Sequence, residues 1–210
     1  MKSTRRWGLS ITVTMLTTLL AAYAALAQVA PAEQNVQSGQ LNFAVTYDAL
    51  HANFITAQNF WMEGGAVELG APLYRSLGIA ARAEGLHSGA SATASEPLSL
   101  LTAAFGPRYT LAAHNQHYSL FGEGLVGIAE GFNSLFPVRS GPVSSANAGT
   151  ITNANSLALD IGGGLDVRLK HHLVVRAIRV SYLRTQLPNT TSNTQNSLSF
   201  SAGIVLNFGK

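Results

Sequence analysis

The chain has 210 residues, of which 47% are apolar and only 11% are charged, and it contains 20 glycines and no cysteine. Soluble domains carry about 25% charged residues, so this composition disfavours an ordinary water-facing surface. The lack of cysteine excludes disulfide frameworks and cysteine-ligated metal centres. The high apolar content, spread along the whole chain, argues against a disordered chain.

The N-terminal segment has the pattern of an export signal. Lys2, Arg5 and Arg6 precede an uncharged stretch that ends in Ala25-Leu26-Ala27. A basic start, an apolar stretch and a small-x-small site are typical of a cleavable signal peptide, although the stretch is also long enough for an uncleaved membrane anchor. We predict a signal peptide over 1–27 and a short periplasmic segment over 28–39. No later segment offers the roughly 20 unbroken apolar residues of a membrane-spanning helix.

The leader also accounts for the basic charge of the chain. Of the 13 Lys and Arg residues, three belong to the leader, and the remaining ten equal the ten Asp and Glu residues. The mature chain is therefore near neutral, and nucleic acid is not expected as a partner.

From residue 40 onward, apolar residues recur at every second position. In the last run, Leu198, Phe200 and Ile204 fall on one face, and small or polar residues fall on the other. A period of two predicts strands whose two faces see different surroundings. The predicted strands cover 40–50, 59–70, 76–87, 98–113, 117–130, 155–169, 173–186 and 197–209.

The predicted connections alternate in length along the chain. Short ones at 71–75, 114–116 and 170–172 separate longer, Ser-, Asn- and Gly-rich ones at 51–58, 88–97, 131–154 and 187–196. Tight periplasmic turns and longer outside loops are typical of outer-membrane barrels, whose strands need about 9–11 residues to cross the bilayer. The sequence therefore predicts an all-β, eight-stranded, antiparallel up-and-down transmembrane β-barrel over 40–209.

Lipid offers no hydrogen bonds, so the polar face of each strand is expected to line the interior. The interior of eight strands is just wide enough for side chains to fill, and mixed charges there can pair. We therefore expect a plugged lumen with an ion-pair network. Its predicted members are Glu68, Arg82, Glu84, Arg108, Glu123, Asp160, Asp166, Arg168 and Arg179.

One pair follows from the register of a hairpin. If the turn is centred between Asn115 and Gln116, Arg108 and Glu123 face each other on adjacent strands. Two residues do not fit the pattern: Glu63 has lipid-facing parity near the outer rim, and Arg176 must either extend to the inner interface or lie beside a β-bulge.

Aromatic residues fall where membrane-interface girdles are expected. Tyr47, Trp61 and Tyr182 are predicted toward the long-loop end, and Tyr74, Tyr109 and Phe208 toward the short-turn end.

Several stretches of the chain resemble the small outer-membrane β-barrel family, which includes the transmembrane domain of OmpA and the opacity-type proteins. They are Phe105 to Tyr109, Phe121-Gly122-Glu123 followed by Gly127, Gly162 to Arg168, Arg176 to Tyr182, and Gly203 to Gly209. The resemblance covers roughly 40–209. It implies export across the inner membrane and insertion by the barrel-assembly machinery. That machinery favours a C-terminal aromatic residue, whereas this chain ends in Phe208-Gly209-Lys210.

Candidate chemistry is sparse. His117 and Ser119 share a face and could act as a base and a nucleophile in acyl transfer, but Glu130 has the opposite parity and His117 lies at a short turn. His114, His171 and His172 are turn histidines without an acidic partner at metal-ligand spacing. Gly162-Gly163-Gly164 lies within a strand pattern, where glycines relieve crowding or allow a bend.

We therefore expect a non-enzymatic integral outer-membrane protein, without cofactor or metal, that serves envelope structure or surface interaction through its loops. Expected partners are outer-membrane lipid and lipopolysaccharide, the assembly machinery, and an unknown extracellular ligand, for which the loop 131–154 is a candidate. The alternatives are a narrow passive pore and a lipid A-modifying enzyme. A soluble lipocalin-like carrier, with the apolar face inward, also remains open.

Overall fold

The computed structural model describes residues 41–55, 58–89, 97–113, 117–134, 136–137, 150–170, 172–188 and 193–208. The predicted signal peptide and the segment 28–39 lie outside the described residues. Within the described part of the chain, no helix is long and apolar enough to cross a membrane.

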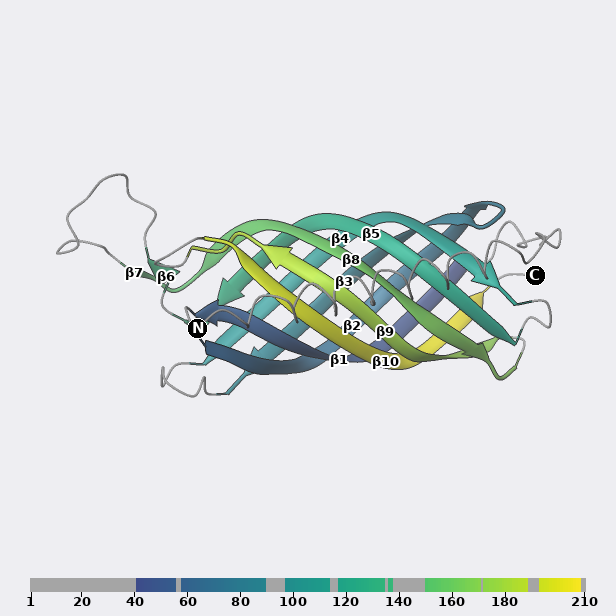
Figure 1. The fold of residues 1–210 in the computed structure, drawn as a ribbon, viewed down its shortest axis with the longest axis horizontal. Coiled ribbons are helices and arrows are strands. Elements are labelled where there is room, and N and C mark those ends of the chain that lie inside the picture. The colour runs from purple at the N-terminus through teal and green to yellow at the C-terminus, as the bar shows by residue number, and fades with distance from the viewer. Residues whose placement is uncertain are drawn as a thin grey trace, which may run out of the picture. The chain divides into compact units, whose positions relative to one another are not determined.

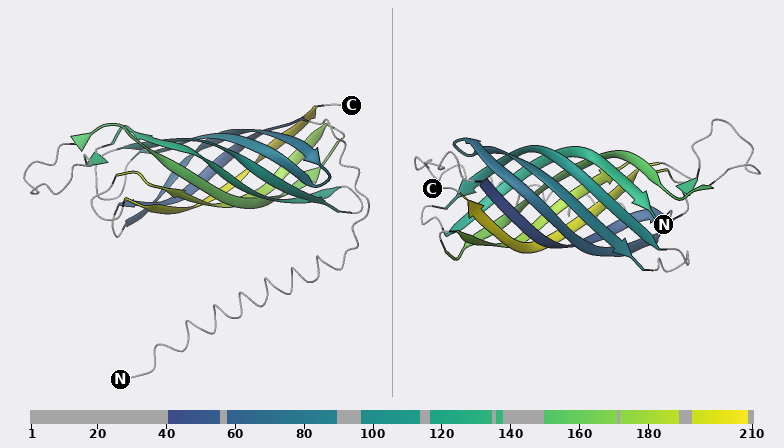
Figure 2. Two further views of the ribbon diagram at one scale, coloured as in Figure 1. Left: turned by 90° about the horizontal axis from the view of Figure 1, so that it is seen from above. Right: turned by 180° about the vertical axis from the view of Figure 1, so that it is seen from behind.

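Eight antiparallel strands close into one barrel, as predicted (Figure 1). Along the chain, each barrel strand pairs with the next, and β1 pairs with β10 to close the sheet. Closure leaves the barrel without an edge strand, so backbone groups along each strand can pair within the sheet. The views in Figure 2 show the strands inclined to the barrel axis on both sides. The strands are β1 (Leu41–Ile55), β2 (Gln58–Tyr74), β3 (Leu77–Ser88), β4 (Leu98–Ala112), β5 (Tyr118–Phe132), β8 (Ala154–Arg168), β9 (Leu173–Thr185) and β10 (Gln195–Phe208).

The first connection differs from the prediction. A long loop was expected over 51–58, but β1 continues to Ile55 and β2 begins at Gln58, so the strict alternation of short and long connections is wrong there. Ala52 pairs with Phe60, and both side chains are buried in an apolar cluster inside the barrel. This burial extends the strand pairing beyond the predicted end of the strand.

The expected long loop 131–154 contains a short hairpin. Asn133 has a φ of 59°, a left-handed conformation that asparagine tolerates, and it follows the end of β5. Beyond it, β6 (Phe136–Pro137) pairs with β7 (Thr150–Ile151). The buried Phe136 joins the same apolar cluster as Ala52 and Phe60.

A β-bulge in β9 resolves the placement of Arg176. Ile178 pairs with Leu165, whereas Arg176 pairs with Asp166, so Ala177 is an extra residue. An extra residue reverses the facing of everything before it in the strand. Arg176 therefore points into the barrel, the second of the two placements that the sequence allowed, and its side chain is fully buried.

Candidate functional site

The middle of the barrel interior holds a connected set of charged side chains, here called the lumen cluster. Alternation along seven strands directs these residues inward, away from the outer surface of the barrel. The cluster consists of Asp48, Glu68, Arg82, Glu84, Arg108, Glu123, Asp160, Asp166, Arg176 and Arg179. Six carboxylates and four guanidiniums give it two more formal negative charges than positive ones.

Glu68 is the centre of one half of the cluster. Its carboxylate lies 2.6 Å from Arg108, 2.9 Å from Arg176 and 3.4 Å from Arg82. Arg82 also donates to both carboxylate oxygens of Asp48, each at 2.8 Å. Glu68 thus joins four strands through one side chain.

Glu123 is the centre of the other half. It accepts hydrogen bonds from Arg108, which lies opposite it in the register that the hairpin predicted, and from Arg179 at 2.7 Å. Arg179 also donates to Asp160 at 2.7 Å and to Ser181 at 2.8 Å. Charge-assisted bonds of this length are roughly twice as strong as neutral ones, so they cross-link the barrel wall.

An aromatic ring packs against two of the arginines. The guanidinium carbons of Arg108 and Arg176 lie 4.7 Å and 4.4 Å from the ring centroid of Phe121. A Cβ at Gly164 would approach this ring to 2.8 Å. Because Gly164 has no side chain, the Phe121 ring can pack against the barrel wall at this position. This agrees with the prediction that the glycine triplet relieves crowding.

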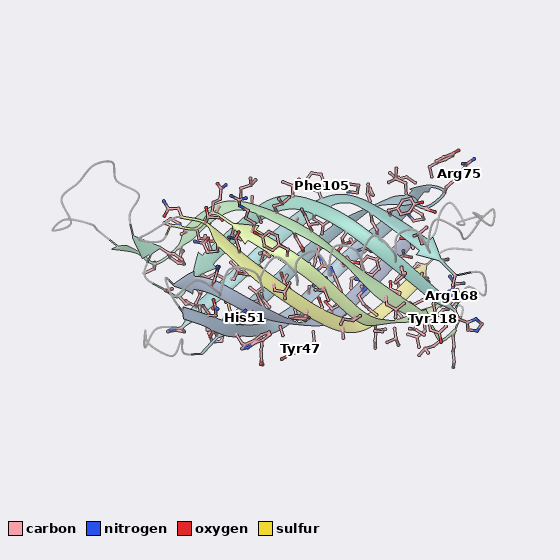
Figure 3. All side chains as sticks on the ribbon, in the orientation of Figure 1. Tyr47, His51, Arg75, Phe105, Tyr118 and Arg168 are labelled. Carbon is pink, nitrogen blue, oxygen red and sulfur yellow. The ribbon has the colours of Figure 1, made fainter. Side chains whose placement is uncertain are left out.

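The structure places eight of the nine predicted lumen residues inside the barrel: Glu68, Arg82, Glu84, Arg108, Glu123, Asp160, Asp166 and Arg179. The prediction of a buried lumen position does not hold for Arg168. It is the last residue of β8, and its side chain is exposed at the barrel end (Figure 3). The prediction also missed Asp48, which is fully buried and has the same parity as Thr46. Parity alone could have found Asp48, but Arg176 required knowledge of the bulge.

Above the lumen cluster, toward the long-loop end, the interior holds a cluster of apolar side chains. Sequence reasoning expected a polar interior and missed this region, here called the apolar cap. Its larger members are Leu50, Phe60, Met62, Leu86, Leu98, Leu100, Phe136, Leu183 and Leu187. Gln195 holds the cap in place through two hydrogen bonds to the backbone of Leu187, each 2.9 Å long. Its side-chain oxygen accepts from the Leu187 N–H, and its NH₂ group donates to the Leu187 carbonyl.

The outer wall carries a continuous apolar belt. On β8, for example, Leu157, Leu159 and Ile161 face outward and are exposed. From Leu157 to Val167 a strand rises about 33 Å, which a tilt of about 40° reduces to about 25 Å, the height of the apolar band of outer-membrane barrels.

Polar residues end this belt toward the long loops on every barrel strand. This outward polar ring consists of His51, Glu63, His87, Ser99, Glu130, Asn155, Arg184 and Asn196. Glu63, which has lipid-facing parity, is thus one member of the ring.

The six predicted girdle aromatics all point outward and are exposed: Tyr47, Trp61, Tyr74, Tyr109, Tyr182 and Phe208. Figure 3 shows Tyr47 and Phe105 directed away from the barrel. The prediction placed Tyr47 toward the long-loop end. In the structure Tyr47 lies in the middle of β1, because that strand continues to Ile55.

The sequence-level enzyme and metal candidates do not come together. Ser119 lies at the beginning of β5 and Glu130 near its end, so the two side chains are far apart along the strand. His114 and His171 lie outside the described residues. Among the residues that the structure describes, no three His, Asp or Glu side chains are grouped so that they could hold a metal ion.

The comparisons with known proteins concern the fold. No family model and no curated protein matches the sequence. The solved structure of Ail, the attachment invasion locus protein of Yersinia pestis, in complex with a heparin analogue, has a TM-score of 0.55 at 15% identity and covers 82% of this chain and 100% of its own. Neisserial surface protein A has a TM-score of 0.58 at 12% identity, covering 81% of this chain and 99% of its own. The chain therefore has the fold of the small eight-stranded outer-membrane β-barrels.

Proposed function

We propose that this protein is an integral outer-membrane barrel with a closed interior that acts in the envelope or at the cell surface through its long-loop end. The observation that carries the proposal is the contrast between the two faces of the sheet. The outside is an apolar belt about 25 Å high, and the inside is filled by the lumen cluster and the apolar cap.

The outer face supports the membrane assignment. Exposed residues there include Phe105 at 68% and Ile128 at 66%. A wall of this kind is unfavourable in water but matches lipid chains. A soluble carrier would require the reverse arrangement, with Asp160 in water and Ile204 in a dry core, whereas Asp160 is buried and Ile204 is 52% exposed. Outer-membrane lipid, lipopolysaccharide and the assembly machinery follow as proposed partners, and export by the predicted signal peptide as the proposed route.

The interior supports a closed barrel rather than a pore. Arg179, Leu50 and Met62 are each 0% exposed, at different depths of the barrel. An ion entering from the long-loop end would meet the apolar cap before any charged group. With the interior filled, the loops and the outer wall are the surfaces left for interaction.

Mobility on an electrophoresis gel tests the barrel. The mature protein, refolded into detergent, should migrate faster unboiled than boiled, because a closed barrel resists the detergent. Identical bands in both lanes, together with solubility without detergent, would contradict the membrane assignment.

Planar bilayers test the closed interior. The wild-type protein should give no step openings, and regular openings would favour the passive pore instead.

Whole-cell labelling tests the orientation. The chain contains no cysteine, so single cysteines can be introduced at Gly89, at the long-loop end, and at Arg75, at the short-turn end. A membrane-impermeant maleimide should label intact cells only at Gly89. Labelling at Arg75 alone would reverse the orientation and remove the proposed surface role of the long loops.

A further inference from the structure

The outward polar ring brings a serine and a histidine from different strands into contact. His87 of β3 and Ser99 of β4 are direct partners in the sheet register. The Nδ1 atom of His87 lies 2.9 Å from the Oγ atom of Ser99. We propose that Ser99 and His87 form a nucleophile and general-base pair that cleaves acyl esters of lipids in the outer leaflet.

The hydrogen bonds around Ser99 allow the direction of proton transfer that this chemistry needs. The side-chain amide of Asn133 donates to Ser99 Oγ at 3.3 Å. An NH₂ group can only donate, so this bond occupies an acceptor lone pair of Ser99 and leaves the hydroxyl proton available for Nδ1 of His87 in the tautomer that carries the ring hydrogen on Nε2. In that tautomer the Nδ1 atom carries no hydrogen, so it can take the serine proton when Oγ attacks.

The surroundings of the pair resemble those of a shielded nucleophile. Ser99 is only 6% exposed, whereas His87 is exposed. Glu63 of β2 is the partner of His87 on the other side of the register. In the register, His87 thus lies between Ser99 on one neighbouring strand and Glu63 on the other.

The wall directly below the pair is open toward the membrane. Gly85 and Leu101 are the next outward pair, and a Cβ at Gly85 would meet nothing within 4 Å. Ala83 and Ala103 are the pair after that. These small residues leave room for an acyl chain along the belt, so that its ester group reaches the polar ring.

The proposed reaction has two balanced steps. Ser99 Oγ bonds to the ester carbonyl carbon while its proton passes to His87, and the ester C–O bond breaks as the leaving alcohol takes that proton. Water then attacks the acylated serine, giving one proton to His87. Release of the fatty acid returns that proton to Ser99 Oγ.

This chemistry goes beyond the proposed function, but it requires the outer wall to face lipid at the long-loop end. The lipid-modifying enzyme that the sequence left open as an alternative used Ser119 as its nucleophile. Ser119 is the second residue of β5, and this strand begins at the short-turn end of the barrel. Ser119 therefore serves as a matched control, because it is also a strand serine, with His117 two residues before it in the chain.

The test uses the full mature protein, refolded in detergent, with a fluorophosphonate probe that reacts only with activated serines. Peptide mass analysis should locate the adduct on Ser99. Ser99→Ala and His87→Gln should each reduce labelling about 100-fold or more, since a general base contributes about 10²–10⁴ in rate. Ser119→Ala should label like the wild type.

Vesicles distinguish the two sources of the ester. One set contains purified lipid A and the other phosphatidylethanolamine, and fatty-acid release is measured in both. Release from either set that Ser99→Ala and His87→Gln abolish supports the proposal and names the lipid class. The exposed position of His87 makes folding of His87→Gln the expected result, even if Ser99→Ala fails to fold.

Two results would overturn the proposal: no adduct on wild-type protein under conditions that label a reference serine hydrolase, or an adduct that persists in Ser99→Ala. Each variant is first checked for the unboiled mobility shift. A protein that shows the shift but no labelling refutes only the enzyme, whereas one without the shift refutes the barrel itself.

Discussion

Removal of Arg179 should be among the most destabilising single changes in the barrel. Its guanidinium is fully buried and contacts Glu123 and Asp160, each at 2.7 Å. In Arg179→Met, Glu123 keeps its contact with Arg108. Asp160 has no such substitute, because its Oδ1 atom has no hydrogen-bond partner among the described residues and its Oδ2 atom loses Arg179.

The magnitude follows from the uncompensated charge. Breaking a buried ion pair by removing one partner costs about 3–5 kcal/mol, because the remaining charge stays desolvated. Arg179→Met should therefore lower the free energy of unfolding by about 3–5 kcal/mol. Arg184→Met, on the exposed outer face of the same strand, should change it by less than about 0.5 kcal/mol.

A double variant separates charge from packing. In Arg179→Met/Asp160→Leu the isolated carboxylate is gone, so the loss should be smaller than the sum of the two single losses by more than about 1 kcal/mol. Urea unfolding in phospholipid vesicles can be followed by the fluorescence of Trp61, which lies 5.0 Å from the ring of His51. Additive losses, or a cost below about 1 kcal/mol for Arg179→Met, would refute the buried-charge reasoning.

Three further changes test other parts of the barrel. Gly127→Ala should prevent the unboiled mobility shift, because its Cβ would lie 1.9 Å from a backbone oxygen, whereas Gly85→Ala should fold normally. Gln195→Ala should lower stability by about 1–3 kcal/mol, measured by urea unfolding, since it leaves buried backbone groups without partners. Ile161→Arg should reduce folding into vesicles, at a cost of about 2–4 kcal/mol, whereas Asn155→Arg at the belt's edge should cost about 0–1 kcal/mol; equal costs would contradict the placement of the belt.

The strands could be predicted from the sequence because the two faces of the closed sheet have different surroundings, so apolar and polar residues alternate along each strand. All eight strands lie within a few residues of their predicted positions, apart from the extensions of β1 to Ile55 and β2 to Tyr74. The pairing of Arg108 with Glu123 could be predicted because a short hairpin transmits its register along both strands. These features depend on local order in the chain.

The features that could not be predicted depend on contacts between distant segments. The inward turn of Arg176 requires the bulge at Ala177, which no local pattern indicates. The apolar cap was missed because the sequence prediction assigned apolar residues to the lipid-facing side. An inward leucine such as Leu50 then looks like a break in the alternation. The contact of His87 with Ser99 crosses a connection between two strands, and only the register brings it about.

The filled interior also determines where function can lie. The interior of an eight-stranded barrel is just wide enough for side chains to fill, and here Glu68 and Glu123 each bind more than one arginine from other strands. A residue so engaged cannot take up a ligand without breaking buried ion pairs, at a cost of about 3–5 kcal/mol each. Most residues of the outward polar ring, His87 among them, are exposed, so water and lipid headgroups can replace their partners. Chemistry in this protein is therefore expected where the belt ends and the loops begin, which is where His87 and Ser99 meet.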